Sequence, residues 1–171
     1  MPQTATTNAL NSATVVTCRI TLGDDARELD NTINVLSVVA CREVNKIPYA
    51  RIRLKDGDVA TGTFPLADGD SFVPGTRIGI ALGYESDDAT VFDGIITSVS
   101  ERVSLHGSET IVEARDEAVK MTTLPANRHF NDITDSDLVT QLIEGYGLTA
   151  DVETSTVTHQ NLVQYHTSDW D

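Results

Sequence analysis

Two Asp-Gly-Asp segments come nearest, by residue type and spacing, to a metal site in this chain. They are Asp56-Gly57-Asp58 and Asp68-Gly69-Asp70. Paired carboxylates suit Ca²⁺, but a calcium loop also needs oxygen ligands at regular offsets, a glycine in mid-loop and a closing glutamate. Neither segment has this pattern, and Asp and Gly are common in turns because they tolerate unusual backbone angles. The sequence therefore favours two turns over a metal site.

A serine follows the second of these segments. Gly69-Asp70-Ser71-Phe72 resembles the Gly-Asp-Ser nucleophile block of a lipase and esterase family. A serine nucleophile needs a positioned histidine and an acid to activate its hydroxyl. In that family the histidine stands three residues after an aspartate, a condition that none of the four histidines of this chain meets: His106, His129, His159 and His166. A polar turn is the favoured interpretation.

A third group of carboxylates, Asp132, Asp135 and Asp137, precedes an apolar helical pattern. Carboxylates are favoured at a helix start by its free N–H groups and its dipole, so capping explains them without catalysis. The histidines have no metal-ligand spacing, and His129 beside Phe130 is typical of a packed histidine. No phosphate-binding loop or dinucleotide fingerprint is present. The sequence predicts no catalytic, cofactor-binding or metal-ligating residues, no cofactor, and a protein that is not an enzyme.

The net charge and the absence of targeting signals restrict the partners. The 171 residues carry a formal charge of −14, which repels phosphate and disfavours nucleic acid and anionic membranes. Residues 1–13 lack the basic start and apolar run of a signal peptide, and no stretch has the length of a membrane-spanning helix. We expect synthesis in the cytoplasm, no nucleic-acid partner and no membrane-spanning segment.

The two cysteines, Cys18 and Cys41, are too few for a disulfide framework. Cys18 lies on an alternating apolar face with Val16, Ile20 and Leu22. A buried free thiol that packs as a small hydrophobe is favoured there, with a single disulfide as the alternative.

Alternating apolar residues predict strands over most of the first 121 residues, with short polar turns and no intervening helices. The segment from Ile33 to Val44 is apolar on both faces and predicts a strand buried on two sides. Gly79, Ala81 and Gly83 form a small face that predicts a close approach or a bend. The pattern begins at Thr14 and indicates an antiparallel barrel or sandwich of six strands: residues 16–22, 33–44, 50–55, 76–84, 91–103 and 109–120.

The pattern changes after Met121. Thr134-Asp135-Ser136-Asp137 fits a capping box, and apolar residues follow at helical spacing, which predicts a helix near residues 135–145. Weaker strand patterns follow at Ala150–Val152 and Leu162–Tyr165. Ser168-Asp169-Trp170-Asp171 resembles a second helix start with no helix after it, so we expect a truncated piece of a longer protein.

Several segments, in this order, resemble the N-terminal part of Rhs-element Vgr proteins, the valine–glycine-repeat spike family, which is similar to contractile phage baseplate hubs and late control protein D. The match extends over about residues 33–171 and is carried by their shared order. The segments are Glu43 to Ala50 with Asp56-Gly57-Asp58, Phe72 to Gly75 with Gly83-Tyr84, Val91 to Thr97, Val112 to Asp116 with Lys120 to Thr122, Thr134 to Asp137 with Tyr146 to Leu148, His159 to Gln164, and Ser168 to Asp171.

This resemblance implies a mostly β fold with minor α (α+β): a phage baseplate-hub-like β-barrel plus part of an α/β insertion. The expected domains are a flexible tail at 1–13, a β-barrel hub domain at 14–122 and the start of a truncated insertion at 123–171. The resemblance implies a structural spike and hub component of a type VI secretion or phage-tail-like injection machine. It also implies a homotrimer in the full-length protein, with tube and baseplate proteins as partners and assembly in the bacterial cytoplasm. Whether the protein is then exported as part of the injection particle is left open.

The resemblance also implies that strands after the insertion complete the first barrel, which would leave this chain with an exposed edge. We expect association through such an edge or through the apolar face of Ile33–Val39. Two alternatives stay open: a stand-alone β-barrel that binds a carbohydrate or peptide, which predicts clustered exposed aromatics, and a cell-wall hydrolase, which predicts a catalytic acid pair or nucleophile.

Overall fold

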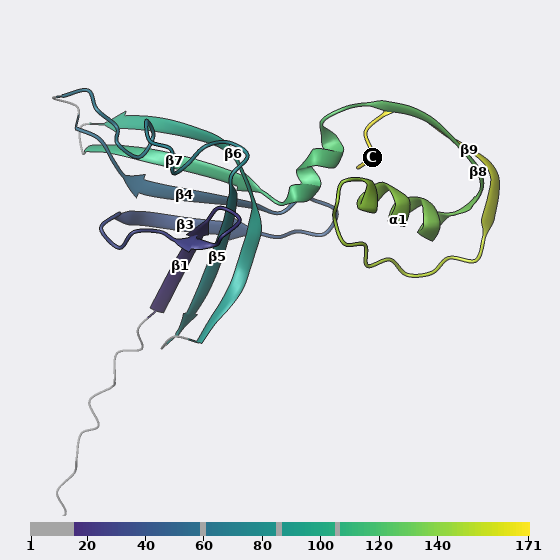
Figure 1. The fold of residues 1–171 in the computed structure, drawn as a ribbon, viewed down its shortest axis with the longest axis horizontal. Helices are drawn as coiled ribbons and strands as arrows, with labels where there is room; N and C mark the ends of the chain where they lie inside the picture. The colour runs from purple at the N-terminus through teal and green to yellow at the C-terminus, as the bar shows by residue number, and fades with distance from the viewer. Residues whose placement is uncertain (1–15, 59–60, 85–86, 105–106) are drawn as a thin grey trace, which may run out of the picture.

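A computed structural model describes residues 16–58, 61–84, 87–104 and 107–171 (Figure 1). The tail predicted at 1–13 and His106 lie outside the described residues. The prediction of a mostly β fold with minor α is confirmed, since two antiparallel sheets are joined by one short 3₁₀ helix and accompanied by one α-helix.

The larger sheet is antiparallel throughout and curves around one apolar core (Figure 1). Its strand order is β2-β1-β5-β6-β7-β4-β3. The strands are β1 (Val16–Leu22), β2 (Arg27–Glu28), β3 (Val35–Cys41), β4 (Tyr49–Lys55), β5 (Arg77–Tyr84), β6 (Asp87–Ser104) and β7 (Gly107–Arg115). In the described part of the chain β1 and β3 do not pair with each other, so the sheet is an open barrel.

The alternation predicted for β1, β4 and β5 places one face of each strand in the core. Ile52 and Leu54 are buried there, whereas Arg51 and Lys55 lie on the outer face. Branched aliphatic residues fill this core because they pack well on a pleated surface. The buried cluster consists of Ile20, Leu22, Ala50, Ile52, Leu54, Phe72, Ile78, Ile80, Phe92, Ile96, Val112 and Ala114.

Two strand predictions in this sheet were wrong in part. The segment predicted as a strand buried on both sides, Ile33–Val44, forms β3 at an open edge, and Val39 and Val44 are exposed. The strand predicted to run to Lys120 ends at Arg115. It ends because Asp116 caps the 3₁₀ helix η1 (Glu117–Thr122) by accepting a hydrogen bond from the Ala118 N–H at 2.9 Å.

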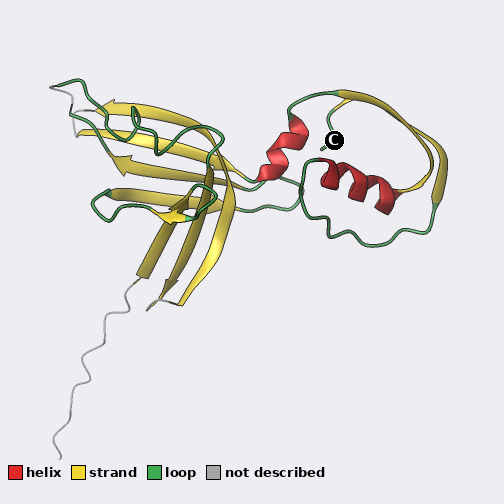
Figure 2. Ribbon diagram, viewed as in Figure 1, coloured by secondary structure: helices red, strands yellow, loops and turns green. Residues whose placement is uncertain are grey.

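The smaller sheet pairs β8 (Ala126–Thr134) with β9 (Thr158–Thr167), and α1 (Asp135–Gly145) lies beside this hairpin (Figure 2). The predicted helix and its cap are confirmed, since the Thr134 hydroxyl accepts from the Asp137 N–H at 3.2 Å. Strand β9 includes the predicted segment Leu162–Tyr165. No strand forms at Ala150–Val152, and β8 has no counterpart among the predicted strands.

Candidate assembly surface

One face of the β1–β5 pair begins in the core and ends in solvent. The cross-strand pairs Leu22–Ile78 and Ile20–Ile80 are buried. The next two pairs on the same face, Cys18–Leu82 and Val16–Tyr84, are exposed, with Val16 at 65% and Tyr84 at 60%. We call Val16, Cys18, Leu82 and Tyr84 the apolar stripe. The prediction that Cys18 is buried was wrong because no described element covers this end of the face.

The apolar stripe includes two residues of β1, one of the strands with an open edge in the curved sheet. Strand β1 pairs with β5 along its length, but on its other side it pairs with β2 only at Thr21 and Leu22. Strand β3 pairs with β4 and has no second strand partner among the described residues. A hollow of about 620 Å³ lies between residues 17–20 of β1 and residues 28–35. An edge of this kind presents unpaired N–H and C=O groups to a further strand.

Charged side chains line this hollow. Arg19 bridges Glu28 and Asp88, with N–O distances of 3.2 Å to each, and the Thr17 hydroxyl donates to Asp88. Desolvation, followed by the nearby charge of Asp88, raises the pKa of the Cys18 thiol. Cys18 is therefore an accessible but protonated thiol at neutral pH. Both cysteines are free, so the alternative of a Cys18–Cys41 disulfide is not observed.

The small face of β5 makes its close approaches within the chain. A side chain on Gly79 would contact the Thr21 hydroxyl of β1, and one on Gly83 would lie 2.1 Å from the Asp87 carbonyl oxygen. The prediction of close packing is confirmed, with β1 and the start of β6 as the neighbours.

A second hollow lies where the C-terminal residues meet the larger sheet. It has a volume of about 410 Å³ and brings together Trp170, Tyr49 and Arg115, which are far apart in the sequence. Tyr49 and Trp170 are 40% and 39% exposed. We call this hollow the junction groove. The complete lining is Cys41, Glu43, Asn45, Lys46, Ile47, Tyr49, Arg115 and Trp170.

A buried polar cluster fixes the position of Trp170. The preceding Asp169 carboxylate accepts hydrogen bonds from Arg128 at 2.6 Å, from Gln164 at 2.8 Å and from Tyr146 at 2.8 Å. Its backbone N–H donates to the Met121 carbonyl at 3.1 Å. The C-terminal residues are thus tied to β8, α1, β9 and η1. Sequence reasoning interpreted Asp169 only as part of a helix cap and missed this role, because its donors come from three separate elements.

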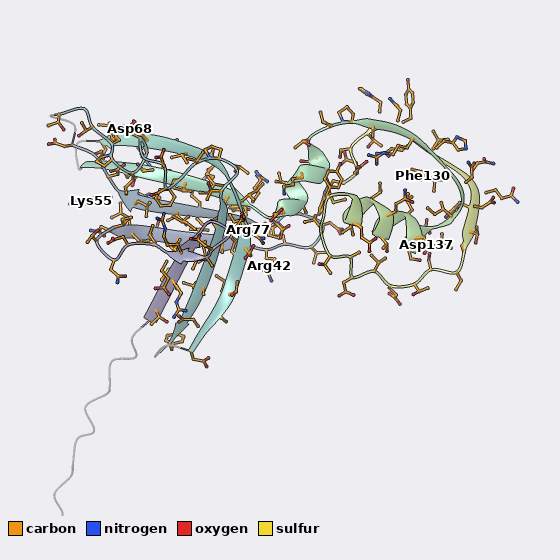
Figure 3. All side chains as sticks on the ribbon, viewed as in Figure 1. Arg42, Lys55, Asp68, Arg77, Phe130 and Asp137 are labelled. Carbon is orange, nitrogen blue, oxygen red and sulfur yellow. The ribbon has the colours of Figure 1, made fainter. Side chains whose placement is uncertain are left out.

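The candidate nucleophile Ser71 lies far from the described histidines. Ser71 is in the loop between β4 and β5, whereas His129, His159 and His166 all lie on β8 or β9. Figure 3 shows the separation through the labels of Asp68, in the Ser71 loop, and Phe130, on β8. His129 is exposed and bonded to Asn131 and Asn161, so the prediction of a packed histidine was wrong.

The aspartates predicted to lie in turns interact with the protein itself. Asp56 is buried, and its Oδ2 accepts from the Leu66 and Ala67 N–H groups and from the Thr110 hydroxyl. Asp68 accepts from the Phe64 N–H at 3.3 Å. At the helix start, Asp135 pairs with His159 at 2.9 Å. Among the described residues, no three His, Cys, Asp or Glu side chains form a group able to hold a metal ion.

A curved, open antiparallel sheet followed by a smaller α/β unit is the fold of known phage-tail and secretion-system proteins. The 43 kDa tail protein of prophage MuSo2 from Shewanella oneidensis superposes with a TM-score of 0.63 at 12% identity, over 91% of this chain and 45% of that chain. The Escherichia coli c3393 protein, described as a type VI secretion component similar to T4 tail proteins gp27 and gp5, gives 0.58 at 14% identity, over 88% and 40%. The chain thus spans less than half of each.

The chain belongs to the Alg8 N-terminal domain family, whose model matches residues 12–171. This family differs by name from the valine–glycine-repeat family that the sequence resembles, while the solved structures share the tail and type VI fold that the resemblance implies. No curated protein sequence matches the chain. Within the described residues, no helix has the length and apolar character needed to cross a membrane.

Proposed function

We propose that this chain is a structural component of the hub at the base of the spike in a contractile injection machine, where it connects tube and baseplate to the spike. Its role is mechanical and not enzymatic. Residues 14–122 form the hub barrel and residues 123–171 begin an α/β insertion. The full-length protein is a homotrimer that assembles in the bacterial cytoplasm.

The observation that carries this proposal is the apolar stripe, two of whose residues lie on the open-edged strand β1. Burial of an exposed aliphatic or aromatic side chain contributes about 1.5–3 kcal/mol, and the stripe presents Val16, Leu82 and Tyr84 together with Cys18. A surface of this kind is stable in an assembly that covers it. The fold shared with tail and type VI proteins agrees with such an assembly.

Sedimentation velocity over a range of protein concentrations tests the proposal, with alkylation of Cys18 as a local probe in a Cys41→Ser background. We expect self-association that protects Cys18 from alkylation. Tyr84→Asp should weaken association by about tenfold or more, since it replaces an apolar contact by a charge. Val157→Asp is the matched control, because Val157 is equally exposed at 62% and lies outside the stripe.

Strictly monomeric behaviour at high concentration, both for this chain and for a longer natural protein that contains it, would contradict the proposal. Turnover of cell-wall fragments would instead support the hydrolase alternative.

A stand-alone module that binds a carbohydrate or peptide is the second candidate. One observation favours it, namely that Tyr49 and Trp170 line the same groove. A monomer that binds a ligand through these two side chains, with no effect of Tyr84→Asp, would distinguish this function from a hub.

A further inference from the structure

The junction groove contains a cation without a partner. Arg115 is exposed at the end of β7, and its guanidinium forms no hydrogen bond or ion pair with any residue that the structure describes. It stands in a row across four strands, in register with Tyr49 on one side and Ile95 on the other, and Tyr49 is in turn opposite Cys41. The backbone of Arg115 is therefore held in the sheet by a strand on each side, and its guanidinium keeps its hydrogen-bond donors free.

The other charges of the groove are already satisfied. Glu43 accepts from the Lys46 ammonium at 2.5 Å and from the Cys41 thiol at 3.4 Å, so this acid and this base neutralise each other. Glu113, whose charge interacts with Arg115, is bound by Arg51 through two hydrogen bonds of 3.0 and 2.6 Å. The groove thus has one uncompensated positive charge in a chain of net charge −14.

Apolar and aromatic walls flank this charge. Tyr49 and Ile47 come from the start of β4 and the turn before it, and Trp170 closes the groove from the C-terminal segment that follows β9. The walls are positioned in advance, because Asp169 anchors the backbone beside Trp170 and the Lys46 N–H donates to the Glu43 carbonyl in the β3–β4 turn. A further hollow of about 220 Å³ shares Tyr49 and Arg115 and extends toward the Arg51–Glu113 pair.

We propose that the junction groove binds a peptide segment of a partner protein in which an aliphatic side chain stands next to a carboxylate. The aliphatic side chain would lie between Tyr49 and Trp170, and the carboxylate would accept hydrogen bonds from Arg115. Arginine recognises carboxylates through a planar fork of donors, and aromatic side chains supply most of the contact energy in small pockets. This binding does not depend on the proposed hub role.

Fluorescence of Trp170 tests the site directly, because it is the single tryptophan of the chain. The 171-residue protein is titrated with the blocked pentapeptide acetyl-Gly-Leu-Glu-Leu-Gly-amide and with its Gln counterpart. We expect a saturable fluorescence change, with at least about tenfold tighter binding of the Glu peptide, since a charge-assisted pair of this strength changes affinity by that factor.

Matched variants distinguish a specific contact of the Arg115 guanidinium from a general effect of the protein's net charge. Arg115→Gln should remove the preference for the Glu peptide while the thermal unfolding midpoint stays unchanged. Arg27→Gln should keep the preference, because it removes the same charge from an exposed arginine outside the groove. Trp170→Ala should weaken binding by about tenfold in isothermal titration, as loss of an aromatic contact in a pocket does.

Three results would overturn the proposal. The first is equal binding of the two peptides, or an unchanged preference in Arg115→Gln. The second is an equal response to glucuronate, which would identify an acidic sugar as the occupant. The third is a fluorescence change with protein concentration alone that persists in Tyr84→Asp, which would show that a second copy of the chain fills the groove. None of these results depends on self-association at the apolar stripe.

Discussion

Arg128 donates a hydrogen bond to Asp169 over 2.6 Å, and the two partners differ sharply in exposure. The Asp169 side chain is only 1% exposed, whereas that of Arg128 is 42% exposed. The buried carboxylate also accepts from Tyr146 and Gln164, so one anion joins β8, α1 and β9. The contribution of this ion pair to stability comes mainly from supplying hydrogen bonds to the buried carboxylate, because the exposed guanidinium can be hydrated without it.

Asp169→Ala should destabilise the smaller sheet and α1. The substitution removes the acceptor of the Tyr146 hydroxyl and of Arg128, and one of the three acceptors of the Gln164 amide. Loss of a charged acceptor for several donors costs about 2–3 kcal/mol. Urea unfolding followed by Trp170 fluorescence measures this loss, since Trp170 is the adjacent residue. Asp151→Ala is the control, because Asp151 is exposed, and its unfolding free energy should stay within about 0.5 kcal/mol of the unsubstituted protein. Equal midpoints for the two variants would contradict the role of Asp169.

The same cluster predicts a pH dependence. Burial raises the pKa of Asp169, but hydrogen bonds from Gln164, Arg128 and Tyr146 outweigh it and hold the pKa below its ordinary value. A carboxyl with a lowered folded-state pKa stabilises the fold above its unfolded pKa, about 3.9 for Asp, and loses this contribution as the pH falls through the folded-state pKa.

The stability difference between the unsubstituted protein and Asp169→Asn should therefore be constant from about pH 7 to pH 5 and shrink below about pH 4. Urea midpoints measured across this range provide the test. Asp151→Asn should give a difference that stays near zero throughout. A difference for Asp169→Asn that grows toward low pH would mean that the pKa is raised and not lowered.

The sequence predicts the strands of the larger sheet well, because the local alternation of apolar and polar residues identifies the apolar face of each strand. It could not predict which parts of that face are covered by another element. Cys18 and Ile20 lie on one face of β1, yet only Ile20 is buried, since coverage depends on neighbouring elements and not on the strand itself. The same limit explains β3, whose two apolar faces indicated burial although the strand lies at an open edge.

The parts that the sequence missed depend on long-range contacts. Strand β8 contains Arg128, His129 and Asn131, which do not alternate with apolar residues, and its pairing with β9 is what fixes it as a strand. The junction groove brings together Tyr49 and Trp170, and no periodicity links residues so far apart. By contrast, the absence of a histidine three residues after an aspartate was readable from the sequence alone.

Asp56→Ala should cost more stability than its place in a turn suggests. The Asp56 carboxylate is bonded by the Thr110 hydroxyl at 2.7 Å and by two backbone N–H groups of the β4–β5 loop. Thr110 is fully buried, so the substitution leaves an unsatisfied hydroxyl inside the protein. We expect a loss of about 2–4 kcal/mol in thermal or urea unfolding. Asp70→Asn, at an exposed position of the same loop, should change the unfolding free energy by less than about 0.5 kcal/mol.

Gly94 in β6 is required by the close passage of β7. A Cβ added there would lie 2.2 Å from the Arg115 carbonyl oxygen and 2.9 Å from the Phe92 ring. The oxygen belongs to the backbone of a neighbouring strand and cannot move without breaking the sheet, as expected where a strand glycine marks a close approach. Gly94→Ala should therefore destabilise the larger sheet by about 3 kcal/mol, at the upper end of overpacking costs.

Thermal unfolding followed by circular dichroism measures this change, and Gly145→Ala provides the control. A Cβ on Gly145 would meet no atom within 4 Å, and alanine is the better helix former by about 1 kcal/mol, so this variant should be unchanged or more stable. If the two glycine variants unfold at the same temperature, the close approach of Arg115 to Gly94 does not constrain the sheet.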